Sequence, residues 1–248
     1  MRTLLAGNWK MNGLRSSLAE IRALKRSAGV RPAADIVICP PATLIAEAAK
    51  TVENAPIDIG AQDCHAEVCG AYTGDISAEM LRDAGAMAVI VGHSERRQHH
   101  HETDQIVSAK LAAACRAGLT AILCIGESEN ERDRGRAIFA VTRQLTECIQ
   151  VELNPAQLAV AYEPLWAIGT GRTPKPEEIM QMHATIRALL NERFGSGGAG
   201  IRILYGGSVK PDNAAQILSL PGVNGALIGG ASLKAADFLS ILRAIPSH

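Results

Sequence analysis

A glutamate at the end of an apolar run is the residue of this chain best suited to move a proton. The run Leu158–Tyr162 predicts a buried strand, because it is short and is closed by Pro164. Glu163 ends the strand, and the small, glycine-ended segment Leu165–Gly171 follows it. Burial disfavours a charged carboxylate and raises its pKa, which suits a general base. We therefore expect a base beneath a segment that closes to exclude water, the alternative being an incidental glutamate in a strand-to-helix loop.

Two further side chains with catalytic potential follow predicted strands. His93 comes shortly after Val89–Val91, so its ring is expected at the end of that strand. Lys10 comes shortly after the first apolar run of the chain. Taken alone, His93 is also compatible with a structural histidine, and Lys10 with an ordinary surface lysine.

Two glycine groups indicate a place for an anion. Gly206-Gly207-Ser208 follows the seventh apolar run, and Gly229-Gly230-Ala231-Ser232 follows the eighth and opens a helix. Glycine lets backbone N–H groups approach an oxyanion closely, and a helix N-terminus adds a favourable dipole. Either pair alone is also typical of a turn, but together at the last two strands they predict a phosphate site.

The elements that must position these residues alternate regularly along the chain. The predicted strands are Leu4–Asn8, Asp35–Cys39, Ile57–Ala61, Ala88–Val91, Thr120–Ile125, Leu158–Glu163, Ile201–Tyr205 and Gly225–Ile228. The predicted helices are Ser17–Ala28, Thr43–Val52, Ala78–Ala84, Asp104–Ala117, Arg136–Glu152, Pro176–Phe194, Asp212–Leu218 and Leu233–Leu242.

Alternation of this kind implies a parallel sheet, and continuous apolar strands imply burial on both faces. An open doubly wound sheet would usually carry G-x-G-x-x-G after its first strand, and this chain does not. The sequence therefore predicts an α/β fold, a closed eight-stranded parallel (β/α)8 TIM barrel, as a single domain over residues 1–248. The active site of such a barrel lies at the carboxyl ends of its strands, where the polar and glycine residues above collect.

Composition narrows the classes of partner. The 248 residues carry 25 basic and 25 acidic side chains, so the chain has no excess of positive charge that would indicate nucleic-acid binding. No stretch approaches the roughly 18 apolar residues of a membrane span. The start of the chain has too short an apolar run for a signal peptide, so a cytoplasmic location is expected.

The cysteines, a run of three histidines and a charge-rich segment could each indicate a metal, redox or charge-based role, but a simpler interpretation is favoured for each. The six cysteines include no C-x-x-C pair, so small buried thiols are expected rather than catalysis or disulfides. His99-His100-His101 lacks partners at ligand spacing, which favours a solvated face and no metal. The mixed charges of Glu127–Arg136 predict a solvated loop and helix start.

The chain resembles the triosephosphate isomerase family in six segments that occur in family order. They are Gly7–Asn12, Gly70–Gly74, Val91–Arg97, Ala161–Gly171, Tyr205–Val209 and Gly225–Gly230. Any one of them can occur by chance, but six spread over the chain are highly specific. The resemblance implies cofactor-independent interconversion of dihydroxyacetone phosphate and D-glyceraldehyde 3-phosphate, a step of glycolysis and gluconeogenesis.

The resemblance also implies the role of each site residue. Glu163 would remove the carbon-bound proton and return it to the neighbouring carbon, while a neutral His93 hydrogen-bonds the developing enediolate. This family is itself a standard example of that pairing of base and histidine. Lys10 would supply positive charge, Asn8 would polarise a substrate oxygen, and Glu95 would orient Lys10. The phosphate would be held by Gly169, Ser208, Gly229 and Gly230.

Thr73 matches the tip of a loop that, in the family, enters the neighbouring subunit and braces its Lys10 and His93. The resemblance therefore implies a homodimer formed through the Thr73 loop. One departure concerns the segment after Glu163. The hydroxyl at the Tyr205 position of the family accepts an N–H from the position that Pro174 occupies here, and proline has no N–H. We expect this latch to be missing.

Two other functions stay open. An isomerase of a related four-carbon ketose phosphate could use the same base and phosphate clamp, since a barrel does not fix its substrate. A noncatalytic barrel that binds sugar phosphates or proteins is the other, although it would have no need of a base.

Overall fold

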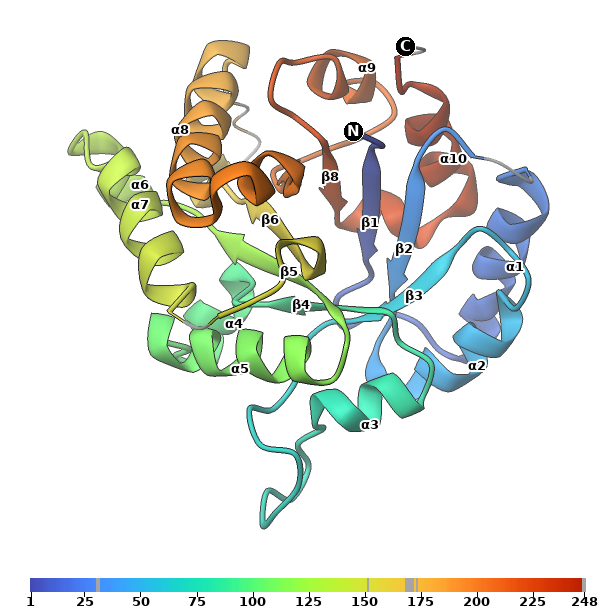
Figure 1. Cartoon of the computed structure of the whole chain (residues 1–248). Coiled ribbons are helices and arrows are strands. Elements are labelled where there is room, and N and C mark those ends of the chain that lie inside the picture. The colour runs from blue at the N-terminus through green and yellow to red at the C-terminus, as the bar shows by residue number, and fades with distance from the viewer. Residues whose placement is uncertain (30–31, 151, 168–171, 173, 247–248) are drawn as a thin grey trace.

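The computed structural model describes residues 1–29, 32–150, 152–167, 172 and 174–246. Its strands form a closed barrel in chain order, with every pair parallel and β1 joined to β8 (Figure 1). The strands are β1 (Leu4–Asn8), β2 (Asp35–Cys39), β3 (Asp58–Ala61), β4 (Ala88–Val91), β5 (Thr120–Ile125), β6 (Leu158–Tyr162), β7 (Arg202–Tyr205) and β8 (Gly225–Ile228).

Helices form a ring outside these strands (Figure 1). They are α1 (Leu18–Ser27), α2 (Ile45–Thr51), α3 (Ala78–Asp83), α4 (Ser94–His99), α5 (Asp104–Arg116), α6 (Glu129–Asp133), α7 (Ala137–Cys148), α8 (Pro176–Phe194), α9 (Ala214–Leu218) and α10 (Ala235–Arg243). Short 3-10 helices are η1 (Arg15–Ser17), η2 (Ala42–Leu44), η3 (Pro155–Gln157), η4 (Leu165–Ala167), η5 (Gly195–Gly200) and η6 (Gly230–Leu233).

The barrel has two apolar layers because successive side chains of a strand point to opposite faces. In β1, Leu4 and Ala6 belong to a cluster inside the barrel, whereas Leu5 packs in the larger cluster between strands and helices. The inner cluster contains small residues such as Ala159 and Ala161 of β6, and every one of its members is buried. Burial on both faces confirms the expectation drawn from the continuous apolar runs.

The predicted strand bounds agree with the structure to within one residue, while some helix bounds differ. The helix expected over Arg136–Glu152 ends at Cys148, and Ile149 has a non-helical backbone (φ −97°, ψ 55°). Gln150 Nε2 donates to the carbonyl of Thr146 at 2.6 Å and satisfies an open acceptor of the last turn. The helices α4 and α6 were not predicted, because they are short and too polar to show an apolar period.

A buried histidine on α8 should make the fold sensitive to acid. His183 is fully buried, its Nδ1 lies 3.0 Å from the Gly222 carbonyl, and its Nε2 has no partner in the described part of the chain. Burial lowers the pKa of His183 from 6.5 to about 4. The folded state therefore gains its proton at lower pH than the unfolded chain, so stability is full above pH 6.5 and is lost as the pH falls towards 4.

The His183 contribution is about 3 kcal/mol of unfolding free energy at about 1.36 kcal/mol per pKa unit. His183→Asn keeps a donor for Gly222 and removes the titrating ring, so we expect a flatter loss of stability between neutral and mildly acidic pH. Denaturant unfolding at several pH values measures this slope, and the exposed His99→Asn serves as control. Equal slopes in wild type and His183→Asn would contradict the assignment.

Among the residues that the structure describes, no helix is long and apolar enough to cross a membrane.

Candidate active site

The polar residues expected at the carboxyl ends of the strands surround one cavity of about 190 Å³. Its lining contains the sequence-predicted residues Asn8, Lys10, His93, Glu163, Ser208, Gly229 and Gly230. They come from the ends of β1, β4, β6, β7 and β8, so barrel closure brings together residues from both ends of the chain. Glu95 and Thr73 do not line this cavity, and Gly169 lies outside the described residues.

Glu163 is 2% exposed and is held by the first turn of α4. Its Oε2 accepts from Ser94 N–H at 2.9 Å, and its Oε1 accepts from Ser94 Oγ at 3.3 Å and lies 3.0 Å from His93 Nε2. Burial raises the pKa of Glu163, but His93 and the Ser94 bonds outweigh it and hold the pKa below its ordinary value. The raised pKa expected from burial alone is therefore wrong for this arrangement, because the sequence did not show these donors.

His93 sits just before α4 as its N-cap residue. Burial lowers the pKa of His93, whereas the Glu163 carboxylate raises it, and the net direction is upward. The N–H of Glu95 donates to His93 Nδ1 at 3.2 Å, which requires an unprotonated Nδ1. A ring that accepts this bond is the neutral tautomer with its proton on Nε2, the nitrogen that faces Glu163.

Lys10 enters the cavity from a left-handed backbone conformation (φ 55°), which is uncommon for a residue other than glycine. Three groups hold it there. Asn8 Oδ1 accepts the Lys10 N–H at 2.9 Å, Gln62 Nε2 donates to the Lys10 carbonyl at 2.8 Å, and Glu95 Oε1 lies 2.6 Å from Lys10 Nζ. The contact with Glu95 is the one that the resemblance implied.

The two glycine groups predicted to bind an anion both line this cavity. Ser208 is exposed to it, and Gly229 and Gly230 come at the end of β8. The helix that follows is the short 3-10 helix η6, in which Ser232 Oγ and N–H both bond to the Gly229 carbonyl at 2.7 and 2.8 Å. These bonds fold the chain back and leave the glycine backbone facing the cavity.

The segment after Glu163 starts with η4, which is held by a buried carboxylate. Glu127 Oε1 accepts from Trp166 Nε1 at 2.7 Å and from Tyr162 Oη at 3.1 Å, and Arg132 Nη1 lies 3.4 Å away. Burial raises the pKa of Glu127. The solvated loop predicted from Glu127 onward is therefore wrong for Glu127, which is 0% exposed because its aromatic donors lie across on β6 and η4. Of the expected lid, residues 168–171 lie outside the described part.

The loop that contains Thr73 extends away from the barrel between β3 and α3 (Figure 1). Thr73 is exposed, and so are the apolar side chains of Tyr72 and Val68. A cavity of about 610 Å³ lies at the base of the loop and is lined by Met11, Gln62 and Lys110 among others. Met11 is 97% exposed, which is unusual for a large apolar side chain.

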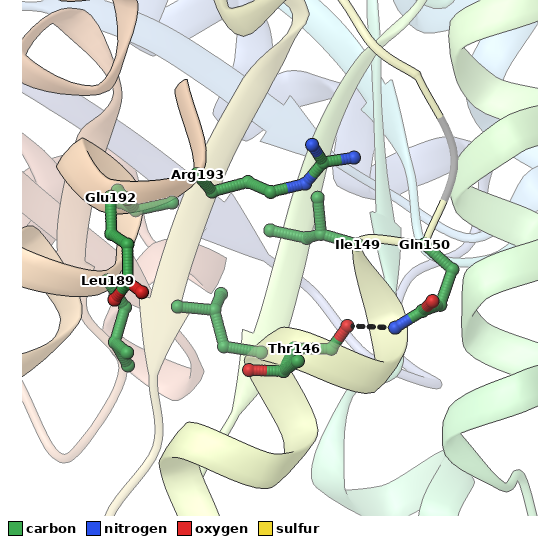
Figure 2. Close-up of a pocket in the computed structure, with 8 residues that line it drawn as sticks. Thr146, Ile149, Gln150, Leu189, Glu192 and Arg193 are labelled. Carbon is green, nitrogen blue, oxygen red and sulfur yellow. Dashed lines mark hydrogen bonds between the residues drawn. The ribbon is translucent and has the colours of Figure 1, made fainter. Parts of the chain in front are cut away.

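A cavity of about 400 Å³, larger than the one at the carboxyl ends of the strands, lies outside the barrel between α7 and α8. Figure 2 shows Leu189, Glu192 and Arg193 of α8 on one side of this cavity and Thr146 and Ile149 on the other, with the Arg193 side chain extended toward Ile149. Helices run back from the carboxyl to the amino ends of the strands, so the carboxyl ends of α7 and α8 place this cavity on the opposite face from the predicted residues. Its size alone does not make it the site.

The histidines and cysteines considered for metal and thiol roles are all in the part of the chain that the structure describes. No group of three or more His, Cys, Asp and Glu side chains there is arranged to hold a metal ion. All six cysteines are free, and Cys39, Cys64, Cys124 and Cys148 are buried, as expected for small apolar residues. Cys115 is only partly buried, and the expectation of a buried thiol is wrong for Cys69, which is exposed. His99, His100 and His101 are exposed, in agreement with a solvated face.

Sequence reasoning missed three residues that hold the site together. Ser94 binds the Glu163 carboxylate, Gln62 binds the Lys10 carbonyl, and Glu127 holds η4. Each is an ordinary polar residue at the end of a strand, so its position was visible but its partner was not. A contact across 69 positions, such as that between Ser94 and Glu163, leaves no local pattern in a sequence.

A carboxylate, a neutral imidazole and an ammonium group around one cavity define a (β/α)8-barrel enzyme suited to proton transfer. The model of the triosephosphate isomerase family matches residues 3–245 of this chain. The chain belongs to the triosephosphate isomerase family, and is an isomerase.

Individual relatives agree with this assignment over the full length of both proteins. Triosephosphate isomerase of Afipia carboxidovorans is 60% identical over 247 residues, which are 99% of this chain and 98% of the relative. That of Xanthobacter autotrophicus is 54% identical and covers 100% and 98% of the two chains. The crystal structure of triosephosphate isomerase from Bartonella henselae superimposes with a TM-score of 0.92 at 46% identity, covering 98% of this chain and 99% of that one.

Proposed function

We propose that Glu163, His93 and Lys10 interconvert dihydroxyacetone phosphate and D-glyceraldehyde 3-phosphate by proton transfer through an enediolate. The observation that carries the proposal is the shared cavity, in which the Glu163 carboxylate and His93 Nε2 lie 3.0 Å apart and face the two glycine groups. A phosphate at the glycine groups leaves the rest of a three-carbon substrate beside Glu163 and His93.

The same base removes the proton from the substrate and returns it. Glu163 takes the proton from one carbon and returns it to the next, so the base is restored after each turnover. His93 donates from Nε2 to the developing oxyanion, and Lys10 and Asn8 add positive charge and a polarised N–H beside it. The residues of this chain supply every group in this course, so it draws on no cofactor or metal.

Substrate binding must break the contact between Glu163 and His93, since both are needed at the substrate. When the Glu163 carboxylate moves away from His93 and Ser94, it loses the groups that lower its pKa, while its burial continues to raise that pKa. The carboxylate thereby becomes a stronger base as it reaches the carbon. Ser94 holds Glu163 in its resting position, and the segment that begins at η4 is expected to close over the active arrangement.

The experiment that tests the function compares turnover of three-carbon and four-carbon ketose phosphates by the wild-type enzyme. We expect fast isomerisation of glyceraldehyde 3-phosphate and slow turnover of the four-carbon substrate, because the cavity of about 190 Å³ is small. A preference for the four-carbon substrate would favour the alternative isomerase. Binding of both without turnover would favour a noncatalytic sugar-phosphate barrel.

The absence of an N–H at Pro174 predicts an unusual response at Tyr205. Tyr205 Oη is buried and has no hydrogen-bond partner among the described residues, and Pro174 is itself buried. Removing a hydroxyl that has no partner costs little. Loss of a hydrogen bond worth about 1 kcal/mol would lower kcat/KM about fivefold. Because no such bond is lost here, we expect Tyr205→Phe to leave kcat/KM within about threefold of wild type.

The matched background for this variant is Pro174→Ala, which restores the N–H. In that background Tyr205→Phe should cost more than in wild type, and a double-mutant cycle on kcat/KM measures the difference. Equal losses in the two backgrounds would show that Tyr205 does not latch this segment in either form.

We further propose that two copies of the chain pair through the Thr73 loop. Support comes from the projecting loop, the exposed Met11 and Tyr72, and the cavity of about 610 Å³ that has room for a loop of the second copy. Within this cavity Glu102 lines the wall, and its Oε2 is buried without a partner among the described residues. A polar group from the second copy would satisfy it.

Thr73→Arg adds bulk and charge at the tip of the loop and should shift the protein to monomers with reduced activity. Sedimentation velocity combined with activity assays over a range of protein concentrations measures both effects. Gln216→Arg, an exposed site on α9, is the control. A Thr73→Arg protein that stays dimeric would contradict the proposed interface.

We place the enzyme in the cytoplasm and treat residues 1–248 as a single domain. Six free cysteines favour a reducing compartment, because disulfides form in oxidising ones. The continuous ladder from β1 through β8 and back to β1 supports one cooperative unit.

A further inference from the structure

One buried glutamine on α7 is hydrogen-bonded to the main chain just after β5. Gln144 Oε1 accepts from Gly126 N–H at 2.8 Å, and Gln144 Nε2 donates to the Gly126 carbonyl at 2.9 Å. The side chain is buried, so water does not compete for these bonds. An amide that satisfies both polar groups of one residue fixes that residue in position and in orientation.

The other side of Gly126 touches the backbone of Glu163. A Cβ added to Gly126 would lie 1.7 Å from the Glu163 carbonyl oxygen, so the two main chains are in direct contact. The residues on either side of Gly126 form hydrogen bonds with the chain segment that begins at Glu163. Glu163 N–H donates to the Ile125 carbonyl at 2.8 Å, and Leu165 N–H donates to the Glu127 carbonyl at 3.2 Å.

Residues 125–127 are therefore a platform that supports Glu163 on one side and is held by Gln144 on the other. Neither Gln144 nor Gly126 lines the cavity at the carboxyl ends of the strands, so Gln144 reaches the site only through this platform. Its neighbours on α7, Val141 and Leu145, belong to the apolar cluster between strands and helices. They support the helix without fixing the direction of the Gly126 peptide groups.

We propose that Gln144 is a positioning residue for the base: it holds Gly126 against Glu163 and thereby sets how far the Glu163 carboxylate reaches toward the substrate carbon. The inference rests on the proposed role of Glu163 as base. A displacement of about 1 Å at a reacting group can cost on the order of 100-fold in rate. The backbone contact at Gly126 has no side chain that could absorb such a displacement.

The test compares Gln144→Met and Gln144→Glu with Leu145→Ala in steady-state isomerisation of glyceraldehyde 3-phosphate. Methionine keeps the length and loses both bonds, so we expect kcat to fall by about 10- to 100-fold with little change in KM. Glutamate still accepts the Gly126 N–H but sets a second acceptor oxygen against the Gly126 carbonyl, so its loss of kcat should be at least as large as that of methionine. Leu145→Ala removes apolar packing one residue away, and we expect it to lower stability while kcat per folded enzyme stays at the wild-type value.

A second readout separates positioning from general loss of structure. If the base is misplaced, proton transfer becomes the slow step, and the primary deuterium isotope effect on kcat should rise in Gln144→Met but not in Leu145→Ala. The folded fraction of each variant is measured by circular dichroism, so that activity is compared per folded molecule.

Unchanged kcat and isotope effect in both Gln144 variants would overturn the inference, as would changes that Leu145→Ala reproduces. Glu163→Asp measured in the same series keeps the two proposals apart. If Glu163→Asp retains full activity, the role of the base itself fails. If Glu163→Asp has a greatly lowered kcat and the Gln144 variants do not, only the positioning role fails.

Discussion

Glu163→Asp is expected to lower kcat for glyceraldehyde 3-phosphate by about 100-fold, with a much smaller change in KM. Aspartate keeps the charge but retracts the carboxylate by one methylene, which misplaces the base by about 1 Å. The phosphate contacts are untouched, so ground-state binding should persist. A coupled assay of isomerisation over a range of substrate concentrations gives both constants.

Glu192→Asp is the control for this substitution, because Glu192 is an exposed carboxylate on α8 beside the cavity of Figure 2. It should retain wild-type kcat and KM. A Glu163→Asp enzyme as fast as wild type would remove Glu163 from the role of base. Slow turnover by wild type and variant alike would instead count against the three-carbon substrate.

Lys10→Met is expected to lower kcat by about 10²- to 10³-fold and to raise KM as well. Methionine has nearly the same length and no charge, so the variant removes positive charge from a site where the substrate carries a phosphate and develops an oxyanion. The loss of one preorganised group facing such an oxyanion typically costs about this much in kcat. The variant also leaves Glu95 without its ammonium partner at 2.6 Å.

The matched control is Lys210→Met, because Lys210 lines the same cavity but is exposed and comes after Ser208. Its removal should affect KM modestly and leave kcat near the wild-type value. Equal effects of the two substitutions on kcat would mean that Lys10 acts only through general attraction of the anionic substrate. Measurements at two ionic strengths strengthen the comparison, because exposed charges are screened more than partly buried ones.

The order and extent of the strands could be predicted because each one is a short apolar run with a clear end. Pro164 and the glycine groups after β7 and β8 mark those ends in the sequence itself. Closure of the barrel places strand ends on one rim, so residues that terminate strands were correctly brought to one cavity. Helices with little apolar periodicity, such as α4, gave no comparable signal.

The electrostatics of the site could not be predicted in the same way. Burial of Glu163 could be inferred from the apolar run before it, but the donors that reverse the direction of its pKa shift come from His93 and Ser94, far away in the chain. The buried state of Glu127 was missed for a similar reason, since its partners Tyr162 and Trp166 follow it by 35 and 39 positions. Charge-rich segments look solvated until their partners are known.

Pairing of the first strand with the last has a consequence for synthesis of the chain. β1 lacks its β8 neighbour until Gly225–Ile228 has left the ribosome, and the second glycine group of the cavity, Gly229-Gly230, directly follows that same strand. Lys10, His93 and Glu163 are all translated earlier, but without the last strand they have no closed cavity in which to act. We therefore expect the nascent polypeptide to be inactive until nearly its whole length has emerged, and a prematurely terminated product that lacks this last strand to have no activity.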